Sequence, residues 1–307
     1  MQIITDIKQI SAFQGSLLSI GNFDGVHLGH QAMLRQLQTQ AQQNNVQSVA
    51  MTFDPPPVAL ISPHRVPPRL STIARKAELI SKIGIDCLFV YSTNTEFLNL
   101  SAEEFFQQIV VQQFHASGMV EGENFFFGAK RQGNIELLEQ FTSQQGISLD
   151  VLAAVSSAGT MISSTRIRHL ISEGEIDEAI ECLGHPYRLS GLVVSGDQRG
   201  RTLGFPTANL TGIKTLIPGD GVYAGSCTHH GKQYAAAINI GGNPTFTKDE
   251  QKIEVHLIGL DEDLYQQELS VDLLARCRDV KQFKSSEELQ EQLEKDIQTV
   301  QQIVALS

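Results

Sequence analysis

The chain has 307 residues and a formal net charge of −11, from 34 acidic and 23 basic side chains. This length is about twice that of a common single domain, so we expect two domains. The negative charge argues against a general electrostatic grip on nucleic acid or on an anionic membrane, and we expect neither as a partner. Any phosphate-binding site must therefore be local.

Hydropathy, the first residues and the cysteines indicate neither a membrane or secreted protein nor one held together by metal or disulfides. Apolar runs fall short of the roughly 18 residues of a membrane-spanning helix. The opening MQIITDIK lacks the basic and apolar regions of a signal peptide, so we expect a cytoplasmic protein. The cysteines are each isolated in the sequence and suggest neither a CxxC metal site nor a disulfide framework; they are Cys87, Cys182, Cys227 and Cys277. The oligomeric state stays open.

Residues 1–184 alternate short apolar runs with helical stripes. The runs that we expect to be strands are 17–20, 46–53, 87–91, 119–120 and 147–155. The helical stripe between the first two consists of Met33, Leu34, Leu37 and Ala41. Strands and helices in alternation predict an α/β domain with a parallel sheet covered on both faces. Such a sheet binds ligands beyond the carboxyl ends of its strands.

The pattern changes near residue 184, where we place the boundary between domains 1–184 and 185–307. The β-like runs that follow are 189–194, 221–227, 234–240 and 252–257, and Gly, Pro and Asn turns separate them. This pattern is typical of a small antiparallel barrel. A closing helix is expected after it, with a stripe of Leu289, Leu293, Ile297, Val300 and Ile303.

Three helix starts carry capping signals. Ser101 stands three residues before Glu104, and Ser285 stands three residues before Glu288. In a capping box, the serine hydroxyl and the glutamate satisfy backbone N–H groups that the first helical turn leaves unpaired. Asn134 can cap the segment ELLEQF in a similar way.

The segment GNFDGVHLGH, residues 21–30, lies between the first predicted strand of this series and the first predicted helix. Its glycines let the backbone approach a ligand closely, and the helix that follows offers unpaired N–H groups to a phosphate. His27 and His30 are three residues apart at the helix entrance, so both imidazoles can face one bound phosphate. A single histidine there would more often be a cap or a surface residue, whereas the HxGH pair is far more specific.

This segment resembles the HxGH motif of the nucleotidyltransferase superfamily, and its longer form resembles the FMN adenylyltransferase module of bacterial FAD synthetases. The resemblance implies a doubly wound fold in which His27 and His30 stabilise charge at the α-phosphate of ATP, without a covalent enzyme intermediate. It also implies nucleotide contacts in the rest of the loop, at Gly21, Phe23, Asp24 and Gly29. Adenylyl transfer needs positioning and electrostatic stabilisation more than a strong nucleophile.

The segment ISSTRIR, residues 162–168, is a second match, to the pyrophosphate-binding SSTxIR motif of the same family. Ser164 and Thr165 can cap a helix and donate hydroxyls, and Arg168 can donate two hydrogen bonds to a phosphate one turn further along. Taken alone, the segment could also be an ordinary helix start with an exposed arginine, although this is the weaker of the two interpretations. After an HxGH motif, the resemblance implies a pyrophosphate site.

Two further stretches resemble the family but depart from its usual pattern. In residues 120–134, Asn124 stands where the family has Asp, which keeps a hydrogen-bonding side chain without its charge. In TFDPPP, Pro56 stands where the family commonly has His, so a third imidazole contact to substrate is in question. Lys130 and Arg131 could add positive charge or could be solvated loop residues.

The stretch GDQRGRTLGFPTANL, residues 196–210, combines a glycine-rich basic loop with PTAN. Thr207 and Asn209 are two apart in an extended run and project to the same side, where their oxygens suit Mg²⁺ with its nucleotide. Together with 221–225, 238–246 and 253–257, this stretch resembles riboflavin kinases, which implies a six-stranded barrel. The nucleotide contacts that the resemblance implies in the loop are Gly196, Gly200, Arg201 and Gly204.

In riboflavin kinases, the Glu of the EVHL run takes the proton from the ribityl 5′-hydroxyl. That residue is Glu254 here, and outside this context it would be an ordinary solvent-facing strand residue. A carboxylate suits the task because the attacking alcohol needs a nearby base while Mg²⁺ neutralises the γ-phosphate.

Both halves match the order of the bacterial bifunctional riboflavin kinase and FMN adenylyltransferase family. The resemblance implies riboflavin, FMN and ATP as substrates and Mg²⁺ as the metal that accompanies ATP. Two alternatives remain: a riboflavin kinase whose other half is inactive, and a flavin or nucleotide sensor without turnover.

Overall fold

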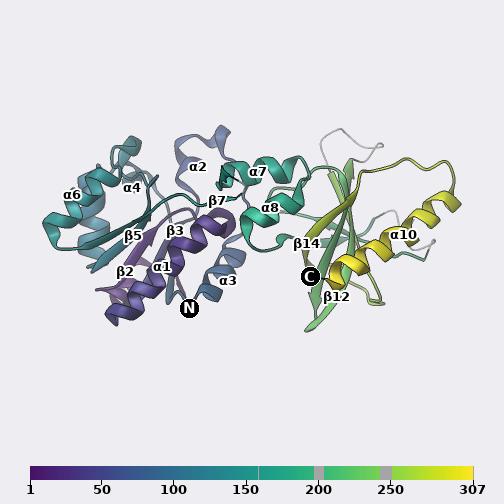
Figure 1. Cartoon of the computed structure of the whole chain (residues 1–307), viewed down its shortest axis with the longest axis horizontal. Coiled ribbons are helices and arrows are strands. Elements are labelled where there is room, and N and C mark those ends of the chain that lie inside the picture. The colour runs from purple at the N-terminus through teal and green to yellow at the C-terminus, as the bar shows by residue number, and fades with distance from the viewer. Residues whose placement is uncertain (158, 197–203, 243–250, 307) are drawn as a thin grey trace. The chain divides into compact units, whose positions relative to one another are not determined.

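The computed structural model describes residues 1–157, 159–196, 204–242 and 251–306 (Figure 1). Contacts within the chain divide it into two compact units. The first comprises Met1–Pro67 and Ser71–Ser163, and the second comprises Pro68–Leu70 and Ser164–Ser307. The domain boundary after residue 184 stays a prediction.

A six-stranded parallel sheet forms the centre of the first unit (Figure 1). Its strand order is β1-β4-β3-β2-β5-β6. The strands are β1 (Gln2–Ile4), β2 (Leu17–Ile20), β3 (Ser48–Phe53), β4 (Cys87–Tyr91), β5 (Gly118–Gly122) and β6 (Ser148–Leu152). All five strands expected in this half are present with adjusted ends, and β1 was not expected. The chain runs from β2 toward β4 on one side and then returns to β5 on the other, which creates the crevice where such sheets bind ligands.

Alternate residues of the strands point into two separate hydrophobic clusters, one on each face of the sheet. Leu17, Ala50 and Leu88 belong to the cluster under helices α1 (Leu28–Asn44) and α3 (Ile73–Ile83). The predicted α1 stripe is buried in that cluster. The parallel sheet is therefore covered on both faces, as predicted.

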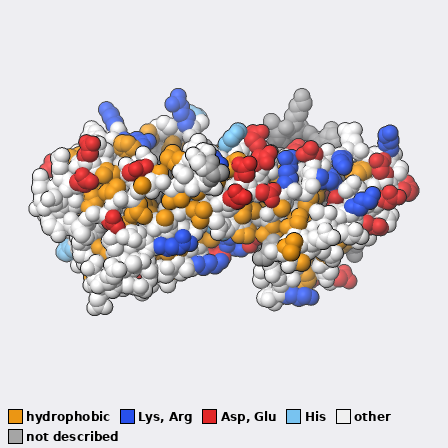
Figure 2. All heavy atoms as spheres, viewed as in Figure 1, with side chains coloured by type: hydrophobic (Ala, Val, Ile, Leu, Met, Phe, Trp, Pro, Cys, Tyr) orange, Lys and Arg blue, Asp and Glu red, His pale blue; other side chains and the backbone are white. Residues whose placement is uncertain are grey.

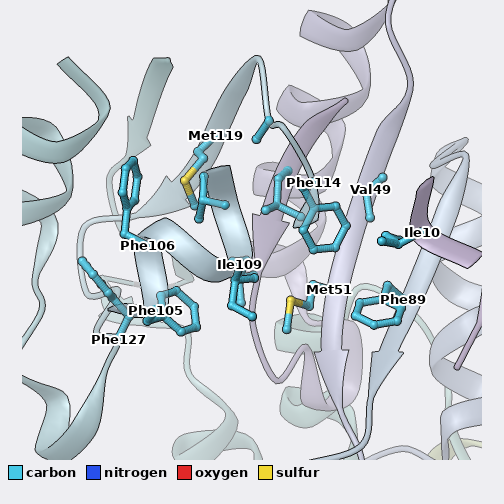
Figure 3. Close-up of a cluster of buried hydrophobic side chains, with 14 of the residues drawn as sticks. Ile10, Val49, Met51, Phe89, Phe105, Phe106, Ile109, Phe114, Met119 and Phe127 are labelled. Carbon is cyan, nitrogen blue, oxygen red and sulfur yellow. The ribbon is translucent and has the colours of Figure 1, made fainter. Parts of the chain in front are cut away.

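The other face of the sheet carries a cluster rich in phenylalanine (Figure 3). In it, the rings of Phe89 and Phe114 meet edge to face with centroids 5.8 Å apart. Ser101 and Glu104 form the predicted capping box at α5 (Ala102–Phe105), which continues as the π-helix η4 (Phe106–Gln113). The remaining elements of this unit are η1 (Ile7–Phe13), η2 (Asp24–Val26), α2 (Pro57–Ile61), η3 (Pro63–Arg65), α4 (Thr95–Asn99), η5 (Ala129–Arg131), α6 (Ile135–Gln145), β7 (Ser156–Ser157) and β8 (Thr160–Met161).

A closed antiparallel barrel forms the second unit, with strand order β10-β13-β12-β11-β14-β9. Its strands are β9 (Tyr187–Val194), β10 (Ala208–Thr211), β11 (Gly221–His229), β12 (Lys232–Gly242), β13 (Gln251–Leu257) and β14 (Glu268–Arg278). Helices α7 (Ser164–Ser172) and α8 (Ile176–Leu183) precede the barrel. The expected barrel is confirmed, with β14 as a strand that the sequence analysis did not mark.

The closing helix α10 (Ser286–Ala305) begins at the predicted Ser285 cap, whose hydroxyl accepts a hydrogen bond from the Glu288 N–H. Val300 of the predicted stripe is fully buried. Asp296 is also buried on this helix and forms a two-pronged ion pair with Arg278 of β14, whose Nη2 lies 2.6 Å from Asp296 Oδ2. An ion pair therefore joins the helix to the barrel alongside the apolar contact.

Candidate active sites

The loop between β2 and α1 has a tightly defined shape. Phe23 has a φ of 44°, in the left-handed region, and its side chain is completely buried. A Cβ on Gly21 would lie 3.2 Å from the Phe23 ring, so a glycine at position 21 leaves room for that ring. The Phe23 ring thus packs inside the first unit, and its predicted contact with nucleotide stays a prediction.

His27 and His30 lie together at the start of α1. Their rings are stacked, with centroids 3.6 Å apart and an angle of 19° between planes. His27 caps the helix, because its Nδ1 accepts the His30 N–H at 3.4 Å, which places the His27 ring proton on Nε2. A Cβ on Gly29 would stand 3.2 Å from His27, so a glycine there leaves room for the ring.

The His30 ring is buried in electrostatically positive surroundings. Burial, the neighbouring His27 and the Lys76 ammonium together lower the pKa of His30 well below its usual value of 6.5. Its Nδ1 is buried and has no hydrogen-bond partner within the described ranges of the chain. In the ligand-free chain His30 is therefore neutral at pH 7, and it offers a ligand one N–H donor rather than a fixed charge.

Two side chains that the sequence analysis missed lie under this loop. Lys76 of α3 is only 5% exposed, and its Nζ donates to the Asn22 carbonyl oxygen at 2.5 Å and to Thr52 Oγ1 at 3.0 Å. Thr52 ends β3 next to the loop and donates its own hydroxyl to the Asn22 carbonyl at 3.1 Å. A signal for Lys76 exists in the sequence, because it falls between Ile73 and Ile80 at the spacing of the buried face of α3.

Asp24, also predicted to bind nucleotide, contacts the start of α3. Its Oδ1 accepts the Ser71 N–H at 3.1 Å, and Ser71 Oγ in turn accepts the Gly25 N–H at 3.0 Å. These bonds hold the turn of the loop in place. The role of Asp24 toward nucleotide stays a prediction.

A cavity of about 620 Å³ opens beside the loop at the carboxyl ends of β2 and β3. Phenylalanine rings dominate its wall, and Gly21, Asn124, Lys130 and Arg131 add polar groups at its lining. The Arg131 guanidinium lies 4.3 Å from the centre of the Phe126 ring. A flat aromatic ligand that carries an anionic group fits this combination of surfaces.

The departures from the family pattern lie at this cavity or next to it. Asn124, in place of the usual Asp, lines the cavity. Pro56, in place of the usual His, precedes α2, whose Pro57, Val58 and Ile61 line the wall. Pro56 has no side-chain donor, so this position cannot supply an imidazole contact.

The predicted pyrophosphate residues belong to helix α7. This helix begins at Ser164, with Thr165 as its second residue, and both fall in the second unit by their contacts. Arg168 donates from Nε to the Pro68 carbonyl oxygen at 2.8 Å, within the same unit. Their contact with a nucleotide stays a prediction.

In the barrel, a polar row crosses three adjacent strands. Asn209 of β10 pairs with Glu254 of β13, which pairs with Asn239 of β12. Paired residues of antiparallel strands project from the same face, so these side chains lie side by side. Glu254 Oε1 lies 3.1 Å from Lys252 Nζ, and its side chain is 28% exposed. The predicted base is thus partly exposed and beside a cation.

Asn209 has the features of a metal ligand. The residue is 8% exposed, and its Oδ1 is buried without a hydrogen-bond partner among the residues that the structure describes. A Cβ on Gly196 would stand 2.6 Å from Asn209 Cγ and 2.8 Å from Oδ1, so glycine leaves the space that this amide occupies. An unpaired buried oxygen beside the carboxylate of Glu254 fits the oxygen ligands that Mg²⁺ takes.

Thr207 lines a second cavity, of about 490 Å³, together with Ala208 and the acidic segment 261–263. Gly204 has a φ of +86°, which only glycine adopts freely, and open space surrounds it. The predicted Gly200 and Arg201 lie outside the residues that the structure describes. The same holds for residues 243–246 of the INIGGNPTF segment.

Comparison with known proteins identifies both units. A family model for FAD synthetase matches residues 9–166, and one for riboflavin kinase matches residues 183–304. A bifunctional riboflavin kinase/FMN adenylyltransferase of Escherichia coli K12 is 34% identical over 310 residues, which cover 100% of this chain and 99% of that relative. A relative of the same name from Listeria monocytogenes is 36% identical, with coverage of 96% and 92%.

A solved structure shares the whole architecture. It comes from Streptococcus pneumoniae, is described as a macrolide-efflux protein, and matches with a TM-score of 0.87 at 30% identity over 98% of each chain. In the present chain, the described helices include none with the length and hydropathy needed to cross a bilayer. Acidic and basic side chains both occur on the face shown in Figure 2.

The similarity to this family extends over nearly the whole chain. The two family models match in the order of the two units, and full-length relatives share about a third of the residues. The chain therefore belongs to the family of bifunctional riboflavin kinases/FMN adenylyltransferases.

Proposed function

We propose that the first unit converts FMN and ATP into FAD and pyrophosphate, and that the barrel converts riboflavin and ATP into FMN and ADP. The observation that carries this assignment is the separation of two different sets of groups. In one unit, a stacked histidine pair belongs to the loop whose first residues line an aromatic cavity. In the other, a carboxylate pairs across strands with an asparagine whose amide oxygen has no partner among the described residues. Each reaction thus has its own site, and the product of the barrel is the substrate of the first unit.

In the adenylyl transfer, a phosphate oxygen of FMN attacks the α-phosphorus of ATP, and the bond to the departing pyrophosphate breaks. Negative charge develops on the oxygens around the phosphorus, where N–H donors from His27 and His30 would stabilise it. The aromatic cavity would hold the flavin ring, with Arg131 near its anionic end. Ser164, Thr165 and Arg168 would bind the pyrophosphate.

In the kinase reaction, the riboflavin 5′-hydroxyl loses its proton to Glu254 and attacks the γ-phosphorus of ATP, and ADP leaves. Thr207 and Asn209 would hold Mg²⁺, which neutralises the phosphate charge when it is bound. The buried Oδ1 of Asn209 supports this role, because the described part of the chain offers it no hydrogen-bond partner. Lys252 keeps the Glu254 carboxylate in one orientation at the edge of the site.

A matched pair of variants tests the assignment. The chain is supplied with riboflavin, ATP and Mg²⁺, and FMN and FAD are separated by chromatography. His30→Ala should lower FAD formation by about a hundredfold or more with FMN formation unchanged, because it removes one donor at the transferring phosphate. Glu254→Gln should lower FMN formation by about a hundredfold or more, with FAD formation from supplied FMN unchanged.

Other results point to the alternatives. FMN without FAD in the unaltered chain would indicate a riboflavin kinase alone, and binding of flavin without any product would indicate a sensor. Equal loss of both activities in either folded variant would contradict the two separate sites.

A further inference from the structure

Lys76 is a buried cation at a position where a helix of this kind normally carries an apolar residue. It is 5% exposed, and it lies on α3 at the spacing of Ile73 and Ile80, on the face that packs against the sheet. Removing an ammonium group from water costs several kcal/mol unless other groups compensate. A lysine without a role in the protein interior could extend its ammonium group to solvent. The burial of the Lys76 ammonium therefore indicates that it serves a role inside the protein.

The contacts of Lys76 connect three elements. Its ammonium donates to the backbone of Asn22 in the loop and to the Thr52 hydroxyl at the end of β3. Thr52 donates to the same Asn22 carbonyl, so the three groups form a closed triangle of hydrogen bonds. Asn22 lies between Gly21 and Phe23, and its carbonyl is thus fixed within the loop that leads to the two histidines.

The charge of Lys76 also reaches the histidine pair. Burial lowers the pKa of His30 most, and the charges of His27, which caps α1, and of Lys76, from α3, lower it further. The edge of the Phe23 ring covers another side of His30, with centroids 5.5 Å apart. A positive charge fixed beneath a loop that receives a triphosphate also raises the local potential for that anion.

We propose that Lys76 is a positioning residue for adenylyl transfer, whose buried ammonium sets both the shape and the potential of the loop that receives the phosphates. The inference deepens the function proposed for the first unit and rests on it. Lys76 acts through Asn22, Thr52 and His30, and it needs no contact with the substrate. Its two effects can be separated, since the hydrogen bonds define the shape and the charge defines the potential.

Four variants of the full-length chain separate these effects. Lys76→Met removes the charge and the hydrogen bonds but keeps the buried stem, and Lys76→Arg restores the charge. Thr52→Val breaks the triangle and leaves the charge in place. Lys82→Met is the matched control, because Lys82 is on the same helix with a 65% exposed side chain.

The direct readout is the pKa of His30, measured by NMR on protein labelled at its histidines and assigned with His30→Gln. We expect a higher pKa in Lys76→Met, recovery in Lys76→Arg, and no change in Thr52→Val or Lys82→Met. In Lys76→Met, kcat for FAD formation should fall by about tenfold or more, because small misplacements of reacting groups are costly. The KM for FMN, set by the aromatic cavity, should change much less.

Kinase activity in the same samples measures the amount of active chain, and circular dichroism checks that each variant is folded. A His30 pKa that is unchanged in folded Lys76→Met would overturn the inference. So would an unchanged kcat for FAD formation in that variant. Retained FAD formation in His30→Ala would instead overturn the function proposed for the whole site, so the two failures are distinguishable.

Discussion

Gly196 should be essential for the kinase activity because of the side chain that it makes room for. In Gly196→Ala the new Cβ would lie 2.6 Å from Asn209 Cγ and 2.8 Å from Oδ1, whereas carbon atoms in contact are normally about 3.5–4.0 Å apart. The amide of Asn209 must therefore move by about 1 Å. A misplacement of that size costs on the order of a hundredfold in rate, equivalent to about 2.7 kcal/mol of transition-state stabilisation.

The assay is the initial rate of FMN formation, with FAD formation from supplied FMN as the internal control. If the methyl group acts through Asn209, the double variant Gly196→Ala/Asn209→Ala should lose little more activity than Asn209→Ala alone. A Gly196→Ala chain that keeps its kinase rate within about threefold would refute the reasoning. A double variant much slower than Asn209→Ala would show that the glycine acts elsewhere.

Two further predictions concern Asn209 and a buried acid of the first unit. Asn209→Ala should raise the Mg²⁺ concentration needed for half-maximal FMN formation by about tenfold, and an unchanged magnesium dependence would remove Asn209 from the metal site. Glu121 is 1% exposed and accepts the Ile20 N–H at 2.8 Å, and burial raises its pKa well above the usual 4.5. The folded chain therefore holds a proton that the unfolded chain releases above pH 4.5, so this group's contribution to stability falls as pH rises toward its folded pKa. Glu121→Gln should weaken this loss of stability with rising pH. Thermal unfolding midpoints measured from pH 5 to 9 should therefore show the stability of the variant, relative to the unaltered chain, increasing with pH. A difference in midpoint that stays constant with pH would contradict a protonated Glu121 in the folded chain.

The parts of the fold that could be predicted are those with a strong local pattern. Fully buried strands such as β2, and helix caps such as Ser101, can be recognised from the sequence. Strand β1 was not predicted because it has only three residues and because Ile3, at the sheet edge, is 54% exposed. β14 begins with regular alternation, but its pairing with β11 shifts register at irregularities, and its second half does not alternate clearly between buried and exposed residues.

The residues of the candidate sites also differ in whether a local sequence pattern reveals them. The histidine pair could be predicted because both residues lie within one short segment next to glycines. The spacing within α3 places Lys76 on the buried face of that helix, but it does not show that Lys76 and Thr52 meet the loop. That contact forms only after α3 and β3 pack against the loop, from 54 and 30 residues away. The unpaired oxygen of Asn209 also needs the barrel, since its burial depends on strands far apart in sequence. Single residues that act through tertiary contacts leave little trace in local patterns.

The closed barrel and the edge strands of the parallel sheet affect how readily the protein aggregates at high concentration. A free strand edge is a template for pairing with another molecule, which is how many β-rich proteins aggregate. The barrel closes on itself, and the sheet ends in the three-residue β1 on one side. On the other side, β6 carries Asp150, whose Oδ2 accepts hydrogen bonds from Gln36 and Gln40 of α1, both at 2.7 Å. A charge anchored on an edge strand discourages an incoming strand, so the folded chain should resist fibril formation.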